Sequence, residues 1–266
     1  MGTWGCGVLK IAKTKSWAII ACLAGLACAA GGAEQEGGHK EVRMGGMRCS
    51  RILFLGNSIT RHPPKADIGW SDDWGMAASA EGKDYVHLLV GRIAAAAGAK
   101  PEAMVQNIAG FERDYAVFDT APLLKKFVEF KPDVVVLAIG ENVPKLDTEE
   151  KKARFKAVVA GLLAGIAKDA RPALFVRSSF WSEPVRDGIL AEVCKDAGGV
   201  FVDISAQGRI EANFARSERK FQNDGVANHP GDRGMQAIAD AIWKAMAAKA
   251  GLPGAAKAAP SESAGK

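Results

Sequence analysis

A serine and a histidine near opposite ends of the chain are the residue types that could perform nucleophilic chemistry. Residues 51–55, Arg-Ile-Leu-Phe-Leu, form an apolar run that ends in Gly-Asn-Ser at residues 56–58. This pattern is typical of a buried parallel strand whose carboxyl end presents Ser58, and open α/β sheets bind their ligands at that edge. His229, in the sequence Asn-His-Pro-Gly, is the predicted base, because a loop histidine followed by proline is held in place outside a core.

Two other interpretations of the serine turn remain open. Ser58 could cap a helix that follows the strand, as serine commonly does. The turn could also be a phosphate-binding loop of the kind found in flavin carriers. The sequence favours this less, because the turn contains one glycine and no basic residue except Arg61.

Two further segments could supply hydrogen-bond donors to a reacting oxygen. Gly110 ends Asn-Ile-Ala-Gly after the second predicted strand, and Asn142 ends Gly-Glu-Asn after the third. The backbone N–H groups of Ser58 and Gly110 and the side-chain amide of Asn142 would together form an oxyanion hole. The alternatives are an ordinary turn glycine and an asparagine that stabilises a turn.

Strands and helices alternate along the chain, which places these segments at one edge of a sheet. Pro122 suits the first turn of one predicted helix, and Asp232 is expected to cap the last one. This alternation predicts an α/β fold, a three-layer αβα sandwich with a central parallel, flavodoxin-like sheet of about five strands. The predicted strands are residues 51–55, 104–107, 133–139, 173–177 and 200–203.

The four segments in this order resemble the SGNH/GDSL hydrolases. Gly-Asn-Ser-Ile-Thr at residues 56–60, Gly110, Asn142 in Gly-x-Asn and His229 in His-Pro match that family's four blocks, over about residues 50–250. The resemblance implies a serine esterase in which Ser58 is the nucleophile and His229 the base. No metal-ligand spacing of cysteine and histidine occurs in the sequence, and we expect no cofactor.

The third member of a catalytic triad departs from the family pattern. The family's orienting aspartate usually lies three residues before the histidine, where this chain has Val226. Asp224 is the nearest acid and would reach the ring if the loop bulges. Otherwise a backbone carbonyl would orient His229, which gives a Ser–His dyad.

An insert directly after the serine suggests a substrate. Trp70 and Trp74 in residues 62–80, and Trp181 after the fourth predicted strand, could stack on a sugar ring or could anchor loops. Because exported SGNH proteins often deacetylate polysaccharides, we expect a carbohydrate or other small-molecule ester, most often an O-acetyl ester. The alternatives are a carbohydrate O-acetyltransferase with the same Ser/His pair and a catalytically inactive sugar-binding relative.

The amino-terminal residues predict export. Residues 1–30 are typical of a signal peptide, with three lysines before an apolar run that is too short to span a membrane comfortably. Cys28 could instead carry a lipid anchor, or translation could start at Met44 or Met47 and leave a cytoplasmic protein. Residues 31–49 are predicted to be a flexible leader, 50–250 the hydrolase domain and 251–266 a disordered tail.

The net charge and the cysteines indicate whether a nucleic-acid partner or a disulfide is expected. The formal net charge is +5, of which three lysines in the predicted signal contribute three, leaving +2. This weak charge, without a basic run interleaved with aromatic residues, argues against a nucleic-acid partner. Cys49 and Cys194 are the cysteines outside the predicted signal, and the sequence favours two unpaired thiols over a disulfide.

Overall fold

A parallel sheet forms the centre of the computed structural model, which describes residues 41–253. In this part of the chain the sheet has five strands in the order β4-β3-β5-β6-β7. That order, numbered along the chain, is the 2-1-3-4-5 order of flavodoxin-like folds, and it confirms the predicted sheet. The strands, none of which differs from its predicted bounds by more than two residues, are β3 (Arg51–Gly56), β4 (Glu102–Asn107), β5 (Val134–Ala138), β6 (Ala173–Arg177) and β7 (Val200–Val202).

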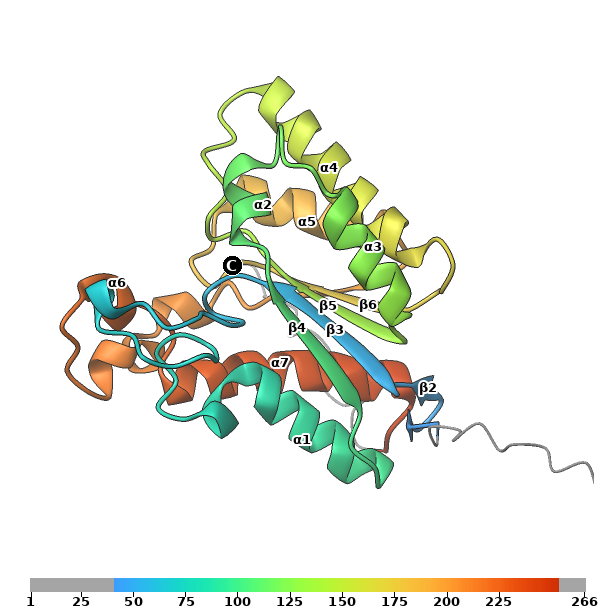
Figure 1. Ribbon diagram of the computed structural model, residues 1–266, viewed down its shortest axis with the longest axis horizontal. Helices are drawn as coiled ribbons and strands as arrows, with labels where there is room; N and C mark the ends of the chain where they lie inside the picture. The colour runs from blue at the N-terminus through green and yellow to red at the C-terminus, as the bar shows by residue number, and fades with distance from the viewer. Residues whose placement is uncertain (1–40, 254–266) are drawn as a thin grey trace, which may run out of the picture. The chain divides into compact units, whose positions relative to one another are not determined.

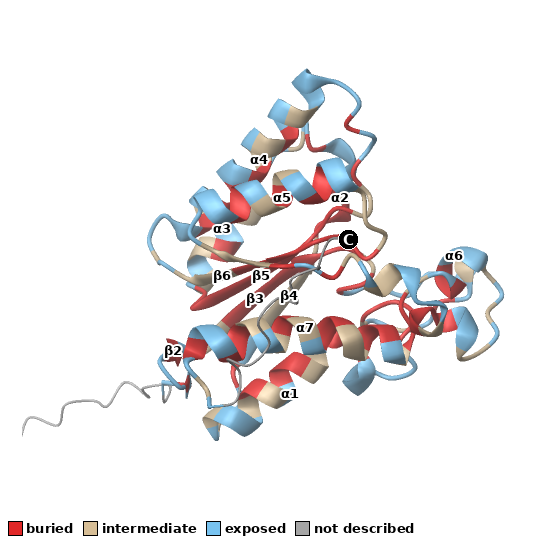
Figure 2. Cartoon of the chain, turned by 180° about the vertical axis from the view of Figure 1, so that it is seen from behind, coloured by how far each residue is buried: buried red, intermediate tan, exposed pale blue. Residues whose placement is uncertain are grey.

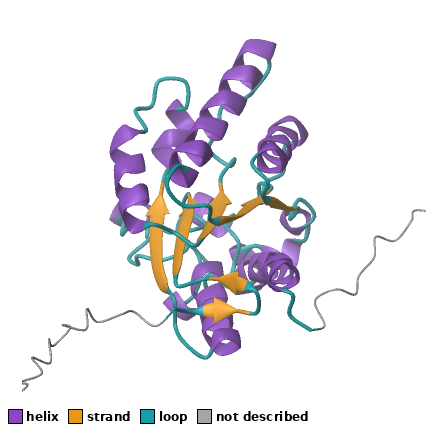
Figure 3. Cartoon of the chain, turned by 90° about the vertical axis from the view of Figure 1, so that its right-hand side faces the viewer, coloured by secondary structure: helices purple, strands orange, loops and turns teal. Residues whose placement is uncertain are grey.

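Helices cover both faces of this sheet and complete the predicted αβα sandwich (Figures 1 and 3). Helices α1 (Tyr85–Ala97) and α7 (Asp232–Ala250) cover one face, and α2 (Ala109–Asp114), α3 (Ala121–Phe130), α4 (Glu149–Ala167) and α5 (Pro184–Asp196) cover the other. Buried residues are concentrated in the sheet and on the inward sides of these helices (Figure 2).

Alternate side chains of strand β3 pack into the cores on the two faces of the sheet. Ile52 and Phe54 belong to the core under α1 and α7, whereas Leu53 and Leu55 belong to the core under α3, α4 and α5. Successive side chains of a strand point to opposite faces, so a strand covered on both sides must be apolar throughout. This explains why the apolar run before Ser58 was a reliable strand signal.

Part of the predicted flexible leader is folded. Strands β1 (Arg43–Met44) and β2 (Met47–Arg48) form an antiparallel hairpin within residues 41–49. Val42, Met44, Met47 and Cys49 are buried against the core of α1 and α7, although the segment is short and rich in glycine. The predicted signal peptide, the Cys28 anchor and most of the predicted tail lie outside the described residues.

The segment before α7 departs from the expected cap. Asp232 is the first helical residue and Gly231 the N-cap, so Asp232 does not cap the helix. Instead the carboxylate of Glu218 accepts the backbone N–H groups of Asp232 and Arg233, each at 2.8 Å. These groups have no partner inside the helix, and an acidic side chain satisfies them while it stabilises the helix dipole.

Short helices complete the described chain around the carboxyl edge of the sheet. Helix α6 spans Asp224–Ala227 and begins where the side chain of Asn223 accepts the N–H of Val226. The 3-10 helices are η1 (Ala66–Ile68), η2 (Glu81–Lys83), η3 (Gln207–Arg209), η4 (Glu211–Asn213) and η5 (Ala215–Ser217). None of the described helices is long and apolar enough to cross a membrane.

The two cysteines of the described chain are free and buried, as the sequence favours. Burial raises the pKa of Cys194 to about 11, so its thiol stays protonated near neutral pH. Cys49 and Cys194 therefore belong to the packing of the core.

Candidate active site

The serine turn follows β3 at the point where the strand order of the sheet reverses. Thr60 and Arg61 each donate a backbone N–H to the carbonyl of Asn57, at 2.9 and 3.0 Å, and close a tight turn with Ser58 inside it. A Cβ atom on Gly56 would lie only 1.9 Å from the Thr60 hydroxyl oxygen, so the strand can end in this turn only with glycine. No helix begins at Ser58, so the helix-capping interpretation does not hold.

The structure brings Ser58 and His229 together. The Oγ atom of Ser58 lies 2.7 Å from Nε2 of His229, a contact between residues 171 positions apart in the chain. The other ring nitrogen, Nδ1, lies 2.7 Å from the carbonyl oxygen of Gly225. A carbonyl can only accept, so Nδ1 carries the proton and Nε2 is left to accept the serine hydroxyl.

The predicted contact between Asp224 and the histidine ring is not formed. Asp224 is exposed in the first turn of α6, and Gly225 supplies the carbonyl that holds His229. The two extra residues between Asp224 and the histidine are taken up by the short helix, which turns the carboxylate outward. The arrangement corresponds to the dyad that the sequence left open.

Burial keeps the candidate base neutral. It lowers the pKa of His229 to about 4, and the hydrogen bond to Gly225 opposes this only in part. The indole of Trp181 packs edge-on against the imidazole, with ring centroids 5.3 Å apart. A neutral imidazole beside a serine hydroxyl is the form that can accept a proton.

The two other predicted donors lie at the same edge of the sheet. Gly110 is in the first turn of α2, where a backbone N–H has no partner inside the helix. Asn142 follows β5 in a turn that places it on the wall of a cavity shared with Ser58 and His229. Its Nδ2 atom lies 2.8 Å from Oε2 of Glu112.

The cavity has a volume of about 360 Å³ and contains both members of the Ser–His pair. That volume is in the range of small-molecule sites. The insert after the serine does line it, through His62, Pro63, Ile68 and Met76. The remaining wall residues come from β4 and α2 and from the α6 segment: Asn107, Ala109, Arg113, Asn223, Gly225 and Val226.

The three predicted sugar-stacking tryptophans are not on this wall. Trp70 is buried, donates its indole N–H to the carbonyl of His62 at 2.9 Å and packs edge-on against Trp74. Trp74 donates its own indole N–H to Ala78 at 3.1 Å. Both therefore anchor the insert, while Trp181 packs on the histidine ring. The sequence alternative of loop-anchoring tryptophans fits Trp70 and Trp74.

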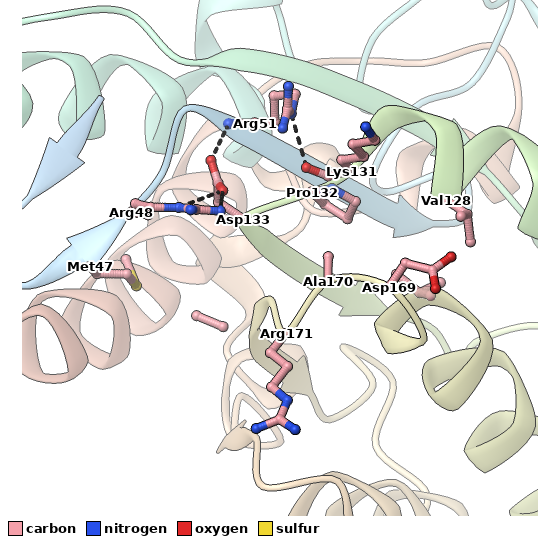
Figure 4. Close-up of a pocket in the computed structure, with 12 residues that line it drawn as sticks. Met47, Arg48, Arg51, Val128, Lys131, Pro132, Asp133, Asp169, Ala170 and Arg171 are labelled. Atoms are coloured by element: carbon pink, nitrogen blue, oxygen red, sulfur yellow. Dashed lines mark hydrogen bonds and ion pairs between the residues drawn. The ribbon is translucent and has the colours of Figure 1, made fainter. Parts of the chain in front are cut away.

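Another cavity, of about 540 Å³, opens at the amino ends of β3, β5 and β6 (Figure 4). Its cations do not converge on one position. Arg48 is held by Asp133 at 2.5 Å, Arg51 donates to the carbonyl of Lys131 at 2.9 Å, and Arg171 points away from these groups (Figure 4). Ser58, Asn142 and His229 thus lie at the opposite edge of the sheet, at the carboxyl ends of the strands.

Solved structures of esterases share this architecture. A two-domain esterase (CEX) active on acetylated mannans, co-crystallised with mannopentaose, superposes with a TM-score of 0.51 at 19% identity over 75% of this chain and 49% of that chain. A second crystal structure of that esterase gives a TM-score of 0.51 at 18% identity, covering 81% of this chain and 53% of that one. This chain therefore spans about half the length of these two-domain proteins.

The chain has the fold of these esterases. The lipase/acylhydrolase from Enterococcus faecalis is a further neighbour, with a TM-score of 0.49 at 16% identity over 75% of this chain and 96% of that chain. No family model matches the sequence, and no curated protein matches it. The low identities mean that the similarity is one of fold.

Within this fold, a buried polar network that no sequence motif predicted supports the serine turn. Asn57 donates its side-chain N–H groups to Glu112 at 3.2 Å and to Glu141 at 2.7 Å. Glu141 also accepts Nη1 of Arg177 at 2.6 Å and the backbone N–H of Phe180 at 2.8 Å. These side chains fix Ser58 relative to α2, β5 and β6.

The network holds two carboxylates beside one guanidinium. Burial raises the pKa of Glu141, but the charge of Arg177 and the hydrogen bonds from Arg177, Phe180 and Asn57 together outweigh it, and the pKa lies below its ordinary value. Burial and the nearby Glu141 raise the pKa of Glu112. The only sequence signal was charge: Glu141 inside Gly-Glu-Asn and Arg177 at the end of a predicted strand are unusual residues for the apolar centre of a sheet.

Proposed function

We propose that this chain is a serine esterase that hydrolyses a small acyl ester through an acyl-enzyme. The observation that carries the proposal is the 2.7 Å contact between Ser58 Oγ and His229 Nε2, with the proton of the ring held on Nδ1 by Gly225. A hydroxyl and a neutral imidazole at this distance form an activated nucleophile. The position of the pair inside a cavity of about 360 Å³ gives an ester access to it.

The first half of the reaction uses the pair directly. Ser58 Oγ bonds to the carbonyl carbon of the ester while its proton passes to Nε2 of His229. The carbonyl oxygen becomes an oxyanion, which the N–H groups of Ser58 and Gly110 and the amide of Asn142 stabilise. His229 then gives the proton to the leaving alcohol oxygen as the carbon–oxygen bond breaks, and the acyl group remains on Ser58.

The second half repeats these steps with water. Nε2 of His229 takes a proton from a water molecule, whose oxygen attacks the acyl carbon, and then returns the proton to Ser58 Oγ as the carboxylic acid leaves. Throughout, the Gly225 carbonyl holds Nδ1–H and keeps Nε2 directed at Ser58. Asp224 has no role in these steps.

The proposed substrate is an O-acetyl ester on a carbohydrate. The support is the fold shared with an esterase whose structure is described as active on acetylated mannans. The cavity wall adds polar groups, His62, Asn107, Arg113 and Asn223, that can hydrogen bond to hydroxyl groups. In this proposal the wall residues, and not the three tryptophans, contact the sugar. The proposal also places the protein outside the cytoplasm, after export.

A transferase remains the second candidate, because the same serine and histidine would pass the acyl group to a sugar hydroxyl instead of water. A reaction with an acetyl donor in the presence and absence of an acceptor sugar separates the two functions. Free acetate in both reactions supports the esterase. Acetylated acceptor with little free acetate supports the transferase.

The first test is labelling with a fluorophosphonate probe, mapped by mass spectrometry. We expect the label on Ser58 in the wild type and its loss in His229→Ala. Release of acetate from acetylated oligosaccharides is then measured on the same preparations. An unlabelled Ser58 in a folded protein would overturn the proposal, and sugar binding without turnover would support the inactive relative instead.

A further inference from the structure

Glu112 is a buried carboxylate placed among the groups that the proposed reaction uses. It lies in α2, two residues after Gly110, and its side chain is fully buried. Four N–H groups point at it: the backbone of Gly140 at 2.5 Å, Nδ2 of Asn142 at 2.8 Å, Nδ2 of Asn57 at 3.2 Å and the backbone of Asn142 at 3.4 Å. Within residues 41–253, no lysine or arginine forms an ion pair with it.

An isolated carboxylate is costly to bury, so an apolar side chain would be the ordinary choice at this position of α2. Here every hydrogen bond to the Glu112 carboxylate comes from a donor in another segment. Gly140 and Asn142 come from the turn after β5, and Asn57 comes from the turn that carries Ser58. The carboxylate therefore joins the predicted oxyanion amide and the nucleophile turn.

The contact with Asn142 decides which way its amide faces. An asparagine amide has two faces that differ little in shape, and rotation by a half-turn exchanges its oxygen and its nitrogen. Oε2 of Glu112 can only accept when ionised, so it selects the orientation with Nδ2 toward α2. The second hydrogen on Nδ2 is then available at the cavity wall, where Asn142 lies beside Ser58 and His229.

The reverse orientation would be harmful to the proposed reaction. It would turn the Asn142 oxygen toward the bound ester, where the carbonyl oxygen becomes negative. An acceptor in that position repels an oxyanion, whereas a donor stabilises it. The choice between the two orientations is thus made by a group that does not touch the substrate.

We propose that Glu112 is a positioning residue that holds the Asn142 amide with its N–H directed at the oxyanion, and that it links this amide to the Ser58 turn through Asn57. This inference rests on the proposed function. Glu112 acts through Asn142 and contacts neither substrate nor nucleophile. Its replacement should therefore slow the chemical step more than it weakens substrate binding.

The test compares Glu112→Gln, Asn142→Ala and the double variant, with Glu129→Gln on the exposed side of α3 as a matched control. In Glu112→Gln one carboxylate oxygen becomes an NH₂ group that must face N–H donors. We expect kcat to fall by about tenfold or more with KM changed by less than about threefold, against about 10²–10³ for Asn142→Ala. In the Asn142→Ala background, Glu112→Gln should cost less than about threefold.

A second measurement does not depend on esterase activity. The side-chain amide signals of Asn142 are assigned in a ¹⁵N–¹H spectrum by their loss in Asn142→Ala. We expect one of its two hydrogens to be shifted downfield in the wild type by the carboxylate, and this shift to be lost in Glu112→Gln and kept in Glu129→Gln. If Glu112→Gln does not fold, Glu112→Asp, whose shorter side chain cannot span the same contacts, takes its place.

The outcomes separate the inference from the proposed function. Effects of Glu112→Gln and Asn142→Ala that multiply, or Asn142 signals that Glu112 does not affect, overturn the positioning role even in an active esterase. If Ser58 is not labelled and acetate release does not exceed the enzyme-free control, the esterase proposal is overturned. The Asn142 signals still report on the hydrogen bond to Glu112 in that case.

Discussion

The Nδ1 atom of His229 lies 2.7 Å from the carbonyl oxygen of Gly225, a neutral acceptor where a triad would have a carboxylate. A carbonyl fixes the tautomer and the orientation of the ring. It offers less stabilisation to an imidazolium than an aspartate does, because it carries no full charge. The carbonyl therefore offsets only part of the effect of burial on the pKa of His229.

Asp224→Asn should leave the reaction almost unchanged. The carboxylate of Asp224 is exposed and does not contact the ring, so its neutralisation removes nothing from the Ser–His pair. We expect kcat/KM within about twofold of the wild type, as for a surface substitution, whereas His229→Ala should abolish turnover. A loss in Asp224→Asn comparable to that in His229→Ala would mean that the carboxylate reaches the ring during turnover.

The activity should persist to unusually low pH. Burial lowers the pKa of His229 to about 4, and the ring must be neutral to accept the proton of Ser58. As the pH falls, kcat/KM should therefore stay level and then decline near pH 4. The measurement is kcat/KM from about pH 3.5 to pH 8 with an ester that does not itself ionise in this range. A decline near pH 6.5 would indicate an ordinary, solvated imidazole.

The same shift makes stability depend on pH, with a sign that can be checked. The pKa of His229 is lower in the folded chain than its ordinary value of 6.5. The unfolded chain therefore binds more protons below that value, and the free energy of unfolding falls as the pH drops toward 4. In urea unfolding between about pH 6.5 and pH 4, His229 should contribute a slope of at most about 1.4 kcal/mol per pH unit, and His229→Gln should remove this contribution. An equal slope in both proteins would contradict the shift.

The buried ion pair should matter far more to stability than a surface pair of the same length. Arg177 and Glu141 meet at 2.6 Å with side chains 0% and 2% exposed, and Lys156 and Glu192 also meet at 2.6 Å but on the surface. Arg177→Met leaves an unpaired buried carboxylate and should cost about 3–5 kcal/mol. Lys156→Met should leave the urea midpoint nearly unchanged. Similar midpoints for the two variants would argue against a buried charge network.

Trp70→Phe tests whether the insert is anchored or binds sugar. Trp70 is buried off the cavity wall and donates to His62, which does line the cavity. Loss of this hydrogen bond should lower stability by about 1 kcal/mol. The KM for an acetylated oligosaccharide should stay within about twofold, as expected where no substrate contact is removed. A KM raised severalfold at unchanged stability would indicate that Trp70 contacts the substrate.

The sequence predicted the sheet and the positions of its polar edge, because strand patterns and turn residues are local. The run before Ser58 is apolar at successive positions, and a strand covered on both faces requires that pattern. The structure then places Ser58, Asn142 and His229 around one cavity at the expected edge. Their roles in a reaction remain predictions.

The contacts that the sequence could not predict depend on how separate segments meet. Asp224 was a reasonable partner for His229 by spacing, but a short helix turns it outward and brings the Gly225 carbonyl to the ring. Nothing in the sequence distinguishes Glu112 from the other acidic residues of the chain. Its importance appears only when the turn after β5 folds over α2 and points two backbone N–H groups at it.

The contact between Ser58 and His229 joins residues 171 positions apart, and the histidine lies just ahead of the last helix. Ser58 is thus synthesised early and His229 late. A nascent chain in which the sheet has formed but α7 has not docked would hold an unactivated serine hydroxyl. In the proposed reaction, Ser58 becomes reactive only after the segment that carries His229 has reached the edge of the sheet.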